Sequence, residues 1–144
     1  MDRRFFIAVK ALLFDQDKFL LVKRSDKARG EHHYWELPGG RMEFGETPEN
    51  ALQRELKEET GLSANILCPL QTWSFFREEE TQIVGITFLC KAEANNVQLS
   101  SEHDDFAWVR FDEITQYNIV PSVLSDLKKL DIGEIDIKIG RAHV

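Results

Sequence analysis

The chain has 144 residues, of which 42% are hydrophobic and 30% charged, and its formal net charge is −7. This composition is typical of a folded globular protein and excludes a disordered chain. The acidic balance argues against DNA as the main partner, because binding to phosphate backbones needs a basic surface. No stretch approaches the roughly 20 consecutive apolar residues of a membrane span, so we expect no membrane insertion and a cytoplasmic location.

The first third of the chain predicts a β-hairpin followed by loops. Residues 5–14 and 18–24 are rich in Phe, Ile, Val and Leu, and the polar letters DQD separate them, which is typical of two strands joined by a turn. The segments SDKARGEHHYW and ELPGGRMEFGET are polar or broken by Pro and Gly, so we expect loops there. No repeat or linker divides the sequence, and its length suits one domain over residues 1–144.

A helix is predicted between Thr47 and Gly61. Thr47 is a good N-cap, and Pro48 suits the first helical position. Glu49 is an acidic residue in the first turn, which the helix dipole favours. Gly61 is the usual kind of residue just after a helix end.

The rest of the chain predicts strands and then helices. Residues 63–75 and 81–92 are expected to be strands joined through REEE, and FAWVRF a shorter strand. The segments DEITQYN and PSVLSDLKKL have a helical pattern, whereas IDIKI alternates apolar and charged residues and predicts a short edge strand. Strands on both sides of the first helix, with helices near the end, predict a mixed α/β sandwich.

The two cysteines, Cys68 and Cys90, lie in the apolar runs ANILCPL and ITFLCKA. Their spacing is not that of a metal site, and two cysteines do not form a disulfide scaffold. We expect both to be buried structural thiols.

The glutamates at the end of the predicted helix break local rules. Glu55, Glu58 and Glu59 are near neighbours on a helix and repel one another, and a helix C-terminus favours cations. At about 100° per residue they share the side that carries the leucines, while Lys57 points away. Arg54 is expected to pair with only one of them. Partly desolvated carboxylates need a cation, and oxygen ligands suit Mg²⁺ or Mn²⁺, with Ca²⁺ as an alternative.

A longer pattern contains these glutamates. Residues 40–62 read Gly40, five residues, Glu46, seven residues, Arg54-Glu55-Leu56, one residue, Glu58-Glu59, one residue, Gly61-Leu62. This resembles the Nudix box, G-x5-E-x7-R-E-U-x-E-E-x-G-U with U aliphatic, at every fixed position. WELPGG before the box and WVRFDEI after it also resemble the family, so the resemblance covers most of the chain. It implies the Nudix fold, an α/β/α sandwich with a mixed β-sheet, and hydrolysis of a nucleoside diphosphate linked to a group X.

The resemblance also implies a role for each residue of the box. The ligands of Mg²⁺ or Mn²⁺ would be Glu55, Glu58, Glu59 and the carbonyl of Gly40. Arg54 would orient a carboxylate, and Glu46 would brace the loop or reach the metal through water. Leu56 and Leu62 would anchor the helix in the core. Metals neutralise a diphosphate and lower the pKa of a bound water, whose proton a nearby carboxylate can accept.

Candidates outside the box rest on their position in the chain. Glu102 lies just before the FAWV strand, where the resemblance to the family implies a functional acidic residue, so it is a candidate general base or metal ligand; the alternative is a solvated loop acid. Arg24, which follows Lys23 at a strand end near the expected cleft, is a candidate phosphate ligand or a solvent-facing strand end. Weaker site candidates are Asp104, Asp105, His32, His33, His103 and His143.

The aromatic residues have two interpretations. Trp73, Phe75 and Phe76 are able to stack on a nucleobase, but packing in the core is the expectation for them. Trp35 and Trp108 are also expected in the core. The REEE segment is expected to be the tip of a hairpin.

The alternatives to a hydrolase are a ligand-sensing Nudix domain without turnover and a diphosphate isomerase on the same fold. The intact set of glutamates argues against the first, and the core-like settings of the cysteines argue against the second. The substrate stays open within the family, with a nucleoside triphosphate or a nucleotide sugar favoured by the short chain. A substrate at an RNA end is disfavoured by the acidic charge. Many members of the family are homodimers, but no residue here indicates one.

Overall fold

The computed structural model describes residues 2–25 and 33–140. In chain order the strands are β1 (Arg4–Asp15), β2 (Lys18–Arg24), β3 (Trp35–Glu36), β4 (Gly39–Arg41), β5 (Ala64–Glu78), β6 (Thr81–Ala92) and β7 (His103–Val109). The helices are α2 (Pro48–Thr60), the 3₁₀ helix η1 (Phe111–Gln116), α3 (Pro121–Lys128) and α4 (Ile132–Lys138). Within the described residues, no helix is long and apolar enough to cross a membrane.

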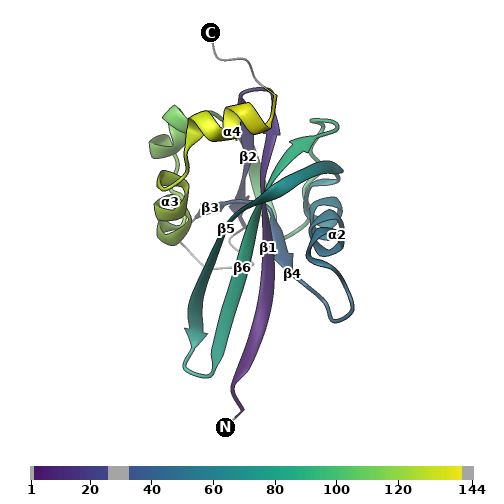
Figure 1. The fold of residues 1–144 in the computed structure, drawn as a ribbon, viewed down its shortest axis with the longest axis vertical. Helices are drawn as coiled ribbons and strands as arrows, with labels where there is room; N and C mark the ends of the chain where they lie inside the picture. The colour runs from purple at the N-terminus through teal and green to yellow at the C-terminus, as the bar shows by residue number, and fades with distance from the viewer. Residues whose placement is uncertain (1, 26–32, 141–144) are drawn as a thin grey trace.

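The sheet is mixed. β1 and β6 run parallel, from Arg4 opposite Thr81 to Phe14 opposite Lys91, and the remaining pairs are antiparallel. The strand order is β3-β2-β1-β6-β5, with β4 paired to β1 and β7 paired to β2. Helix α2 lies on one side of the sheet, and α3 and α4 lie on the other (Figure 1). The α/β/α sandwich with a mixed sheet is therefore confirmed.

Both faces of β1 and β2 are buried, and successive residues face opposite layers. Val9, Ala11 and Leu13 join the cluster that contains Leu52 and Leu56 of α2. The intervening residues of β1 join a second cluster with α3 and α4, whose members include Leu12, Phe14, Leu127, Ile135 and Ile139. This alternation explains why residues 11–14 of β1 and 19–22 of β2 are apolar without interruption, and it fixes α2 against the central strands.

The predicted boundaries of α2 are confirmed. The hydroxyl of Thr47 accepts a hydrogen bond from the backbone N–H of Asn50 at 3.2 Å, and Pro48 begins the helix. Gly61 ends it with φ of 72°, and its N–H donates to the carbonyl of Lys57. These caps fix the ends of the helix, whereas the packing of Ala51, Leu52 and Leu56 in the core decides which glutamates face the sheet.

Several other predictions need correction. The IDIKI segment is not a strand, because it belongs to α4, in which the side chain of Asp131 caps the N–H of Glu134. Ile135 and Ile139 are buried and Ile137 is 71% exposed. The two buried isoleucines are four residues apart, so they lie on one face of a helix, which the alternating letters did not indicate. The WELPGGR stretch is also not all loop, since it supplies β3 and β4. β7 begins three residues before the predicted FAWVRF strand and ends two residues before its end.

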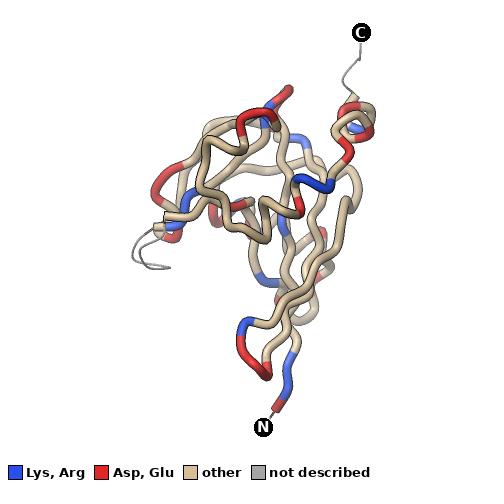
Figure 2. Tube along the Cα trace, turned by 90° about the vertical axis from the view of Figure 1, so that its left-hand side faces the viewer, with Lys and Arg blue, Asp and Glu red and all other residues tan. Residues whose placement is uncertain are grey.

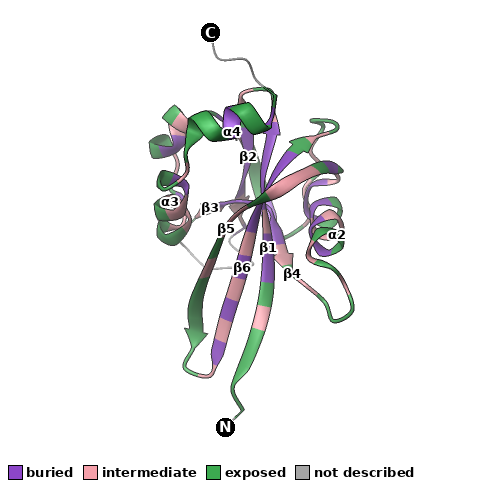
Figure 3. Cartoon of the chain, viewed as in Figure 1, coloured by how far each residue is buried: buried purple, intermediate pink, exposed green. Residues whose placement is uncertain are grey.

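The hairpin of β5 and β6 extends beyond the helices, together with the N-terminal half of β1 (Figure 1). Side chains at this end of β5 are exposed, as the green segment of β5 in Figure 3 shows. The turn holds the predicted REEE tip, and Arg3 lies 3.4 Å from Glu80 there. Figure 2 shows these basic and acidic segments side by side at the end of the hairpin.

Candidate active site

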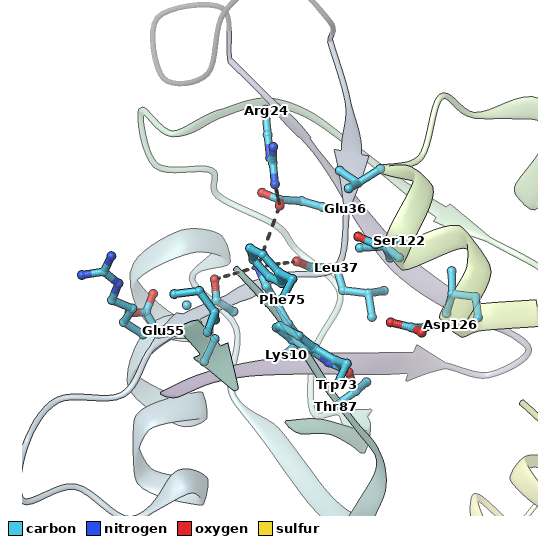
Figure 4. A pocket seen from close by; sticks show the side chains of 18 of the residues that line it. Lys10, Arg24, Glu36, Leu37, Glu55, Trp73, Phe75, Thr87, Ser122 and Asp126 are labelled. Carbon is cyan, nitrogen blue, oxygen red and sulfur yellow. Dashed lines mark hydrogen bonds and ion pairs between the residues drawn. The ribbon is translucent and has the colours of Figure 1, made fainter. Parts of the chain in front are cut away.

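A cavity of about 1020 Å³ lies between the sheet and α3. Lys10 of β1, Glu55 of α2 and Trp73 of β5 reach it from three elements (Figure 4). Ser122 and Asp126 of α3 line the opposite wall. The cavity is large enough for a nucleotide-sized ligand.

The three glutamates of α2 differ in exposure. Glu59 is buried and only 5% exposed, and the side chain of Glu55 is 14% exposed. The side chain of Glu58 is 58% exposed. The expected overlap with the apolar face therefore holds for Glu55 and Glu59, whereas Glu58 lies at the rim, where water reaches it.

The backbone after β3 comes very close to these carboxylates. The N–H of Gly39 donates a 2.9 Å hydrogen bond to Glu59. A Cβ atom added at Gly40 would lie 2.5 Å from an oxygen of Glu55. Gly40 thus leaves the space that lets the Glu55 carboxylate lie directly against the main chain.

Arg54 joins more carboxylates than expected. Its guanidinium lies 2.7 Å from Glu46, 3.0 Å from Glu55 and 3.4 Å from Glu58. It also donates to the carbonyl of Arg41 at 2.9 Å. The prediction of a single partner was wrong because a guanidinium has five N–H donors in a planar fork. Arg54 therefore links α2 to the loop that carries Glu46.

The pKa values of the carboxylates reflect this arrangement. Burial raises the pKa of Glu59 to about 7, although Lys10 and the N–H of Gly39 act against the shift. Burial also raises the pKa of Glu55, against the hydrogen bond from Arg54. The hydrogen bond from Arg54 instead lowers the pKa of Glu46 to about 2. Glu55 and Glu59 are thus short of compensating positive charge, and a bound cation would stabilise both.

A second group of charged residues lies at the floor of the cavity, and the sequence interpretation named Arg24 and His103 as site candidates but missed Glu36 and Lys10. Glu36 accepts hydrogen bonds from Arg24 at 3.0 Å and from Nε2 of His103 at 2.8 Å, and Lys10 lies 3.8 Å away. Burial alone would raise the pKa of Glu36, but Lys10, His103 and Arg24 hold it well below its usual range. The sequence did contain one signal for Glu36: it is a charged residue between Trp35 and Leu37, and residues of those two types are often buried.

Of the acidic candidates near the start of β7, Glu102 belongs to the cavity, whereas Asp104 and Asp105 have other partners. Glu102 is exposed and lines the cavity. Oxygen atoms of Glu59 and Glu102 and a ring nitrogen of His103 lie within 4.8 Å of one another. Asp104 instead forms an ion pair with Lys23 at 3.2 Å, and Asp105 accepts a hydrogen bond from the backbone N–H of Phe106.

The remaining candidates are placed as follows. Arg24 lines the cavity, but its guanidinium is bonded to Glu36. His33 is exposed, and His32 and His143 lie outside the described residues. Cys90 is buried as expected, whereas Cys68 is only half-buried.

The aromatic residues of β5 do not all pack in the core. Trp73 and Phe75 line the cavity with their rings stacked at 6.0 Å and an interplanar angle of 15° (Figure 4). Phe75 is 47% exposed and Phe76 is 67% exposed, so the core expectation was wrong for both. The reason is that β5 extends beyond the helices there. Trp35 and Trp108 are partly buried against the two core clusters.

Comparisons with known proteins identify the family of the chain. The model of the NUDIX domain family matches residues 4–127. The nucleoside triphosphatase NudI of Escherichia coli O17:K52:H18 (strain UMN026 / ExPEC) is 30% identical over 119 residues, which cover 75% of this chain and 84% of that protein.

Solved structures of Nudix proteins share the fold. The MutT protein from Methanosarcina mazei Go1 is 27% identical, with a TM-score of 0.70 and coverage of 98% of this chain and 99% of that one. The MutT NUDIX hydrolase from Burkholderia pseudomallei is 22% identical, with a TM-score of 0.76 and coverage of 90% and 100%. Because the family match spans most of the residues, the chain belongs to the NUDIX family and is a pyrophosphohydrolase.

Proposed function

We propose that the chain hydrolyses the diphosphate linkage of a nucleoside diphosphate bonded to a group X, with a nucleoside triphosphate as the favoured substrate. The observation that carries the proposal is the pair Glu55 and Glu59, two carboxylates withdrawn from water at the wall of a nucleotide-sized cavity. The name of the relative NudI, a nucleoside triphosphatase, supports the choice of substrate.

The residues of the site fit a hard divalent cation, Mg²⁺ or Mn²⁺. Its ligands would be Glu55, Glu58, Glu59 and the carbonyl of Gly40. The raised pKa values of Glu55 and Glu59 support this, because a cation removes the energetic cost of two ionised carboxylates in one buried place. Such an ion neutralises diphosphate oxygens and lowers the pKa of a bound water.

Other residues of the chain position the reacting groups. Arg54 fixes the rotamers of Glu55 and Glu58 through its guanidinium fork. Glu46 holds Arg54 in turn and accepts from the N–H of Glu43 at 2.7 Å, so it braces the loop. Glu102, at the edge of the same group of carboxylates, is able to accept the proton of the attacking water or to bind the cation.

The walls of the cavity suit the two halves of a nucleotide. The stacked rings of Trp73 and Phe75 present an aromatic surface to a base, which stacking stabilises. Lys10 and Arg77 also line the cavity and supply positive charge for phosphates. Arg24 is less available for that purpose, because Glu36 holds its guanidinium at 2.9 Å.

The test is release of phosphate or pyrophosphate from a nucleotide panel, with and without Mg²⁺ or Mn²⁺. We expect metal-dependent turnover that falls at least 100-fold in Glu55→Gln and in Glu59→Gln. Glu49→Gln is the matched control, since Glu49 is exposed in the first turn of the same helix. Unchanged turnover in both site variants would overturn the assignment of these residues. Tight binding of one nucleotide with no turnover would favour a sensor instead.

The isomerase alternative gains no support from the cysteines. Cys90 is buried, and Cys68 packs against the apolar cluster of α3 and α4. Neither belongs to the residues that line the cavity in the described part of the chain.

A further inference from the structure

His103 has an unusual environment for a ring so deeply buried. The residue is 5% exposed, and its Nε2 atom lies 2.8 Å from Oε2 of Glu36. Its Nδ1 atom is inaccessible to water and has no hydrogen-bond partner among the described residues. A buried polar atom without a partner is costly, so it needs an explanation, and a bound ion is one of the usual ones.

The contacts of Glu36 decide which ring nitrogen carries a proton. Arg24 lies 2.9 Å from the carboxylate, and Lys10 lies 3.8 Å from it. A carboxylate held by a guanidinium and an ammonium group is ionised and has only acceptor atoms. Nε2 of His103 therefore donates its hydrogen to Glu36. In the neutral ring this leaves the lone pair on Nδ1.

His103 also has carboxylate neighbours. One of its two ring nitrogens and carboxylate oxygens of Glu59 and Glu102 lie within 4.8 Å of one another, and Nδ1 is the nitrogen that Glu36 leaves without a partner among the described residues. Bonds of about 2.1 Å from nitrogen and oxygen to one ion require ligand atoms roughly 3–4 Å apart, so small side-chain movements would complete the set. Glu102 is exposed and is therefore able to make such a movement.

We propose that His103, through Nδ1, forms a mixed nitrogen and oxygen site with Glu59 and Glu102 that selects a divalent transition metal such as Zn²⁺, Co²⁺ or Mn²⁺ over Mg²⁺. Imidazole nitrogen suits these ions, whereas Mg²⁺ takes oxygen ligands. Glu36 then has the role of the carboxylate that commonly orients a metal-binding histidine through its other nitrogen. The inference shares Glu59 with the proposed hydrolytic site, but it concerns metal binding and is tested without substrate.

The direct test is nitrogen NMR of the ¹⁵N-labelled chain titrated with ZnCl₂ and, separately, with MgCl₂. We expect Zn²⁺ to shift the Nδ1 resonance of His103 strongly while Nε2 changes little, and Mg²⁺ to leave both in place. Comparison with His103→Gln identifies the resonances among those of the four histidines. An unshifted Nδ1 at saturating Zn²⁺ would overturn the proposal.

Calorimetric titration of the variants gives a second measure. We expect His103→Gln to weaken Zn²⁺ binding at this site tenfold or more, and to change Mg²⁺ binding less than twofold. Asp104→Asn is the control, because Asp104 is the next residue but pairs with Lys23 instead. Equal Zn²⁺ affinity in wild type and His103→Gln would contradict the proposal. Loss of turnover in Glu55→Gln with Zn²⁺ binding retained would separate this site from the hydrolytic function.

Discussion

Gly40 lies directly beneath the carboxylate of Glu55, so closely that a methyl group on Gly40 would meet both oxygens and the carboxyl carbon at 2.5–2.8 Å. The obstructing atoms are the end of a flexible side chain, not backbone. The fold can therefore accept a methyl group at residue 40, but Glu55 cannot then keep its position.

The first prediction follows from this contact. Gly40→Ala is expected to lower kcat/KM by about 10- to 100-fold, since a displacement of about 1 Å at a catalytic group has effects of this size. The midpoint of urea unfolding should change little, and circular dichroism should match the wild type. Gly133→Ala is the control, because it places the same methyl group in α4, where Asp131 lies at 3.4 Å. Full activity in Gly40→Ala would show that the position of Glu55 is unimportant.

The second prediction concerns the pH dependence of the Glu46–Arg54 pair. The pKa of Glu46 falls from 4.5 to about 2 in the folded chain, mainly through the hydrogen bond from Arg54. A lowered pKa means that the contribution of Glu46 to stability is complete above about pH 4.5 and is lost as the pH falls toward 2. The difference in urea midpoint between wild type and Glu46→Gln should therefore be constant from pH 8 to 6 and shrink below pH 4.5. A difference that grows on acidification would contradict the pairing.

The third prediction concerns the cysteines. Burial raises the pKa of the Cys90 thiol to about 12, so almost no thiolate is present at pH 8. Cys90 should resist a thiol reagent in the native chain and react once guanidinium unfolds it, as counted by mass spectrometry after alkylation. The Cys68→Ser variant isolates Cys90 for this measurement. Rapid native labelling of that variant would show that the strand opens readily.

The fourth prediction tests the aromatic wall of the cavity. Phe75→Ala should raise KM by about fivefold or more with a smaller change in kcat, because base stacking on an aromatic ring contributes about 1–3 kcal/mol. Phe76→Ala is the matched control, since Phe76 is also exposed but does not belong to the residues that line the cavity. Equal effects of the two substitutions would argue for a general effect on β5 and against substrate contact.

The sequence predicted those parts of the fold that depend on contacts between residues close in the chain, such as the ends of α2. Thr47, whose hydroxyl accepts from the N–H of Asn50, and Gly61, whose N–H donates to the carbonyl of Lys57, cap the two ends of α2 by contacts within a few residues. The IDIKI segment was misassigned because its alternating letters are compatible with a strand, and only the packing of Ile135 and Ile139 against α3 and the sheet decides for a helix.

The site was predictable only where its residues are close in sequence. Glu55 and Glu59 are four residues apart, so a helical wheel placed them together. Glu36 and His103 are far apart in the chain, and their contact exists only because β3 and β7 both pair with β2. No local pattern in either segment indicates that pairing, and so the role of Glu36 was missed although His103 was a site candidate.

The parallel pairing of β1 with β6 has a consequence for how the chain folds. β1 is made before β6 during synthesis, and its longest neighbour, β6, spans Thr81–Ala92 and follows many residues later. Contacts of such high sequence separation have a large loop-closure cost and slow the folding reaction. The apolar residues of β1 therefore stay accessible to other partners, such as chaperones, until β6 has left the ribosome.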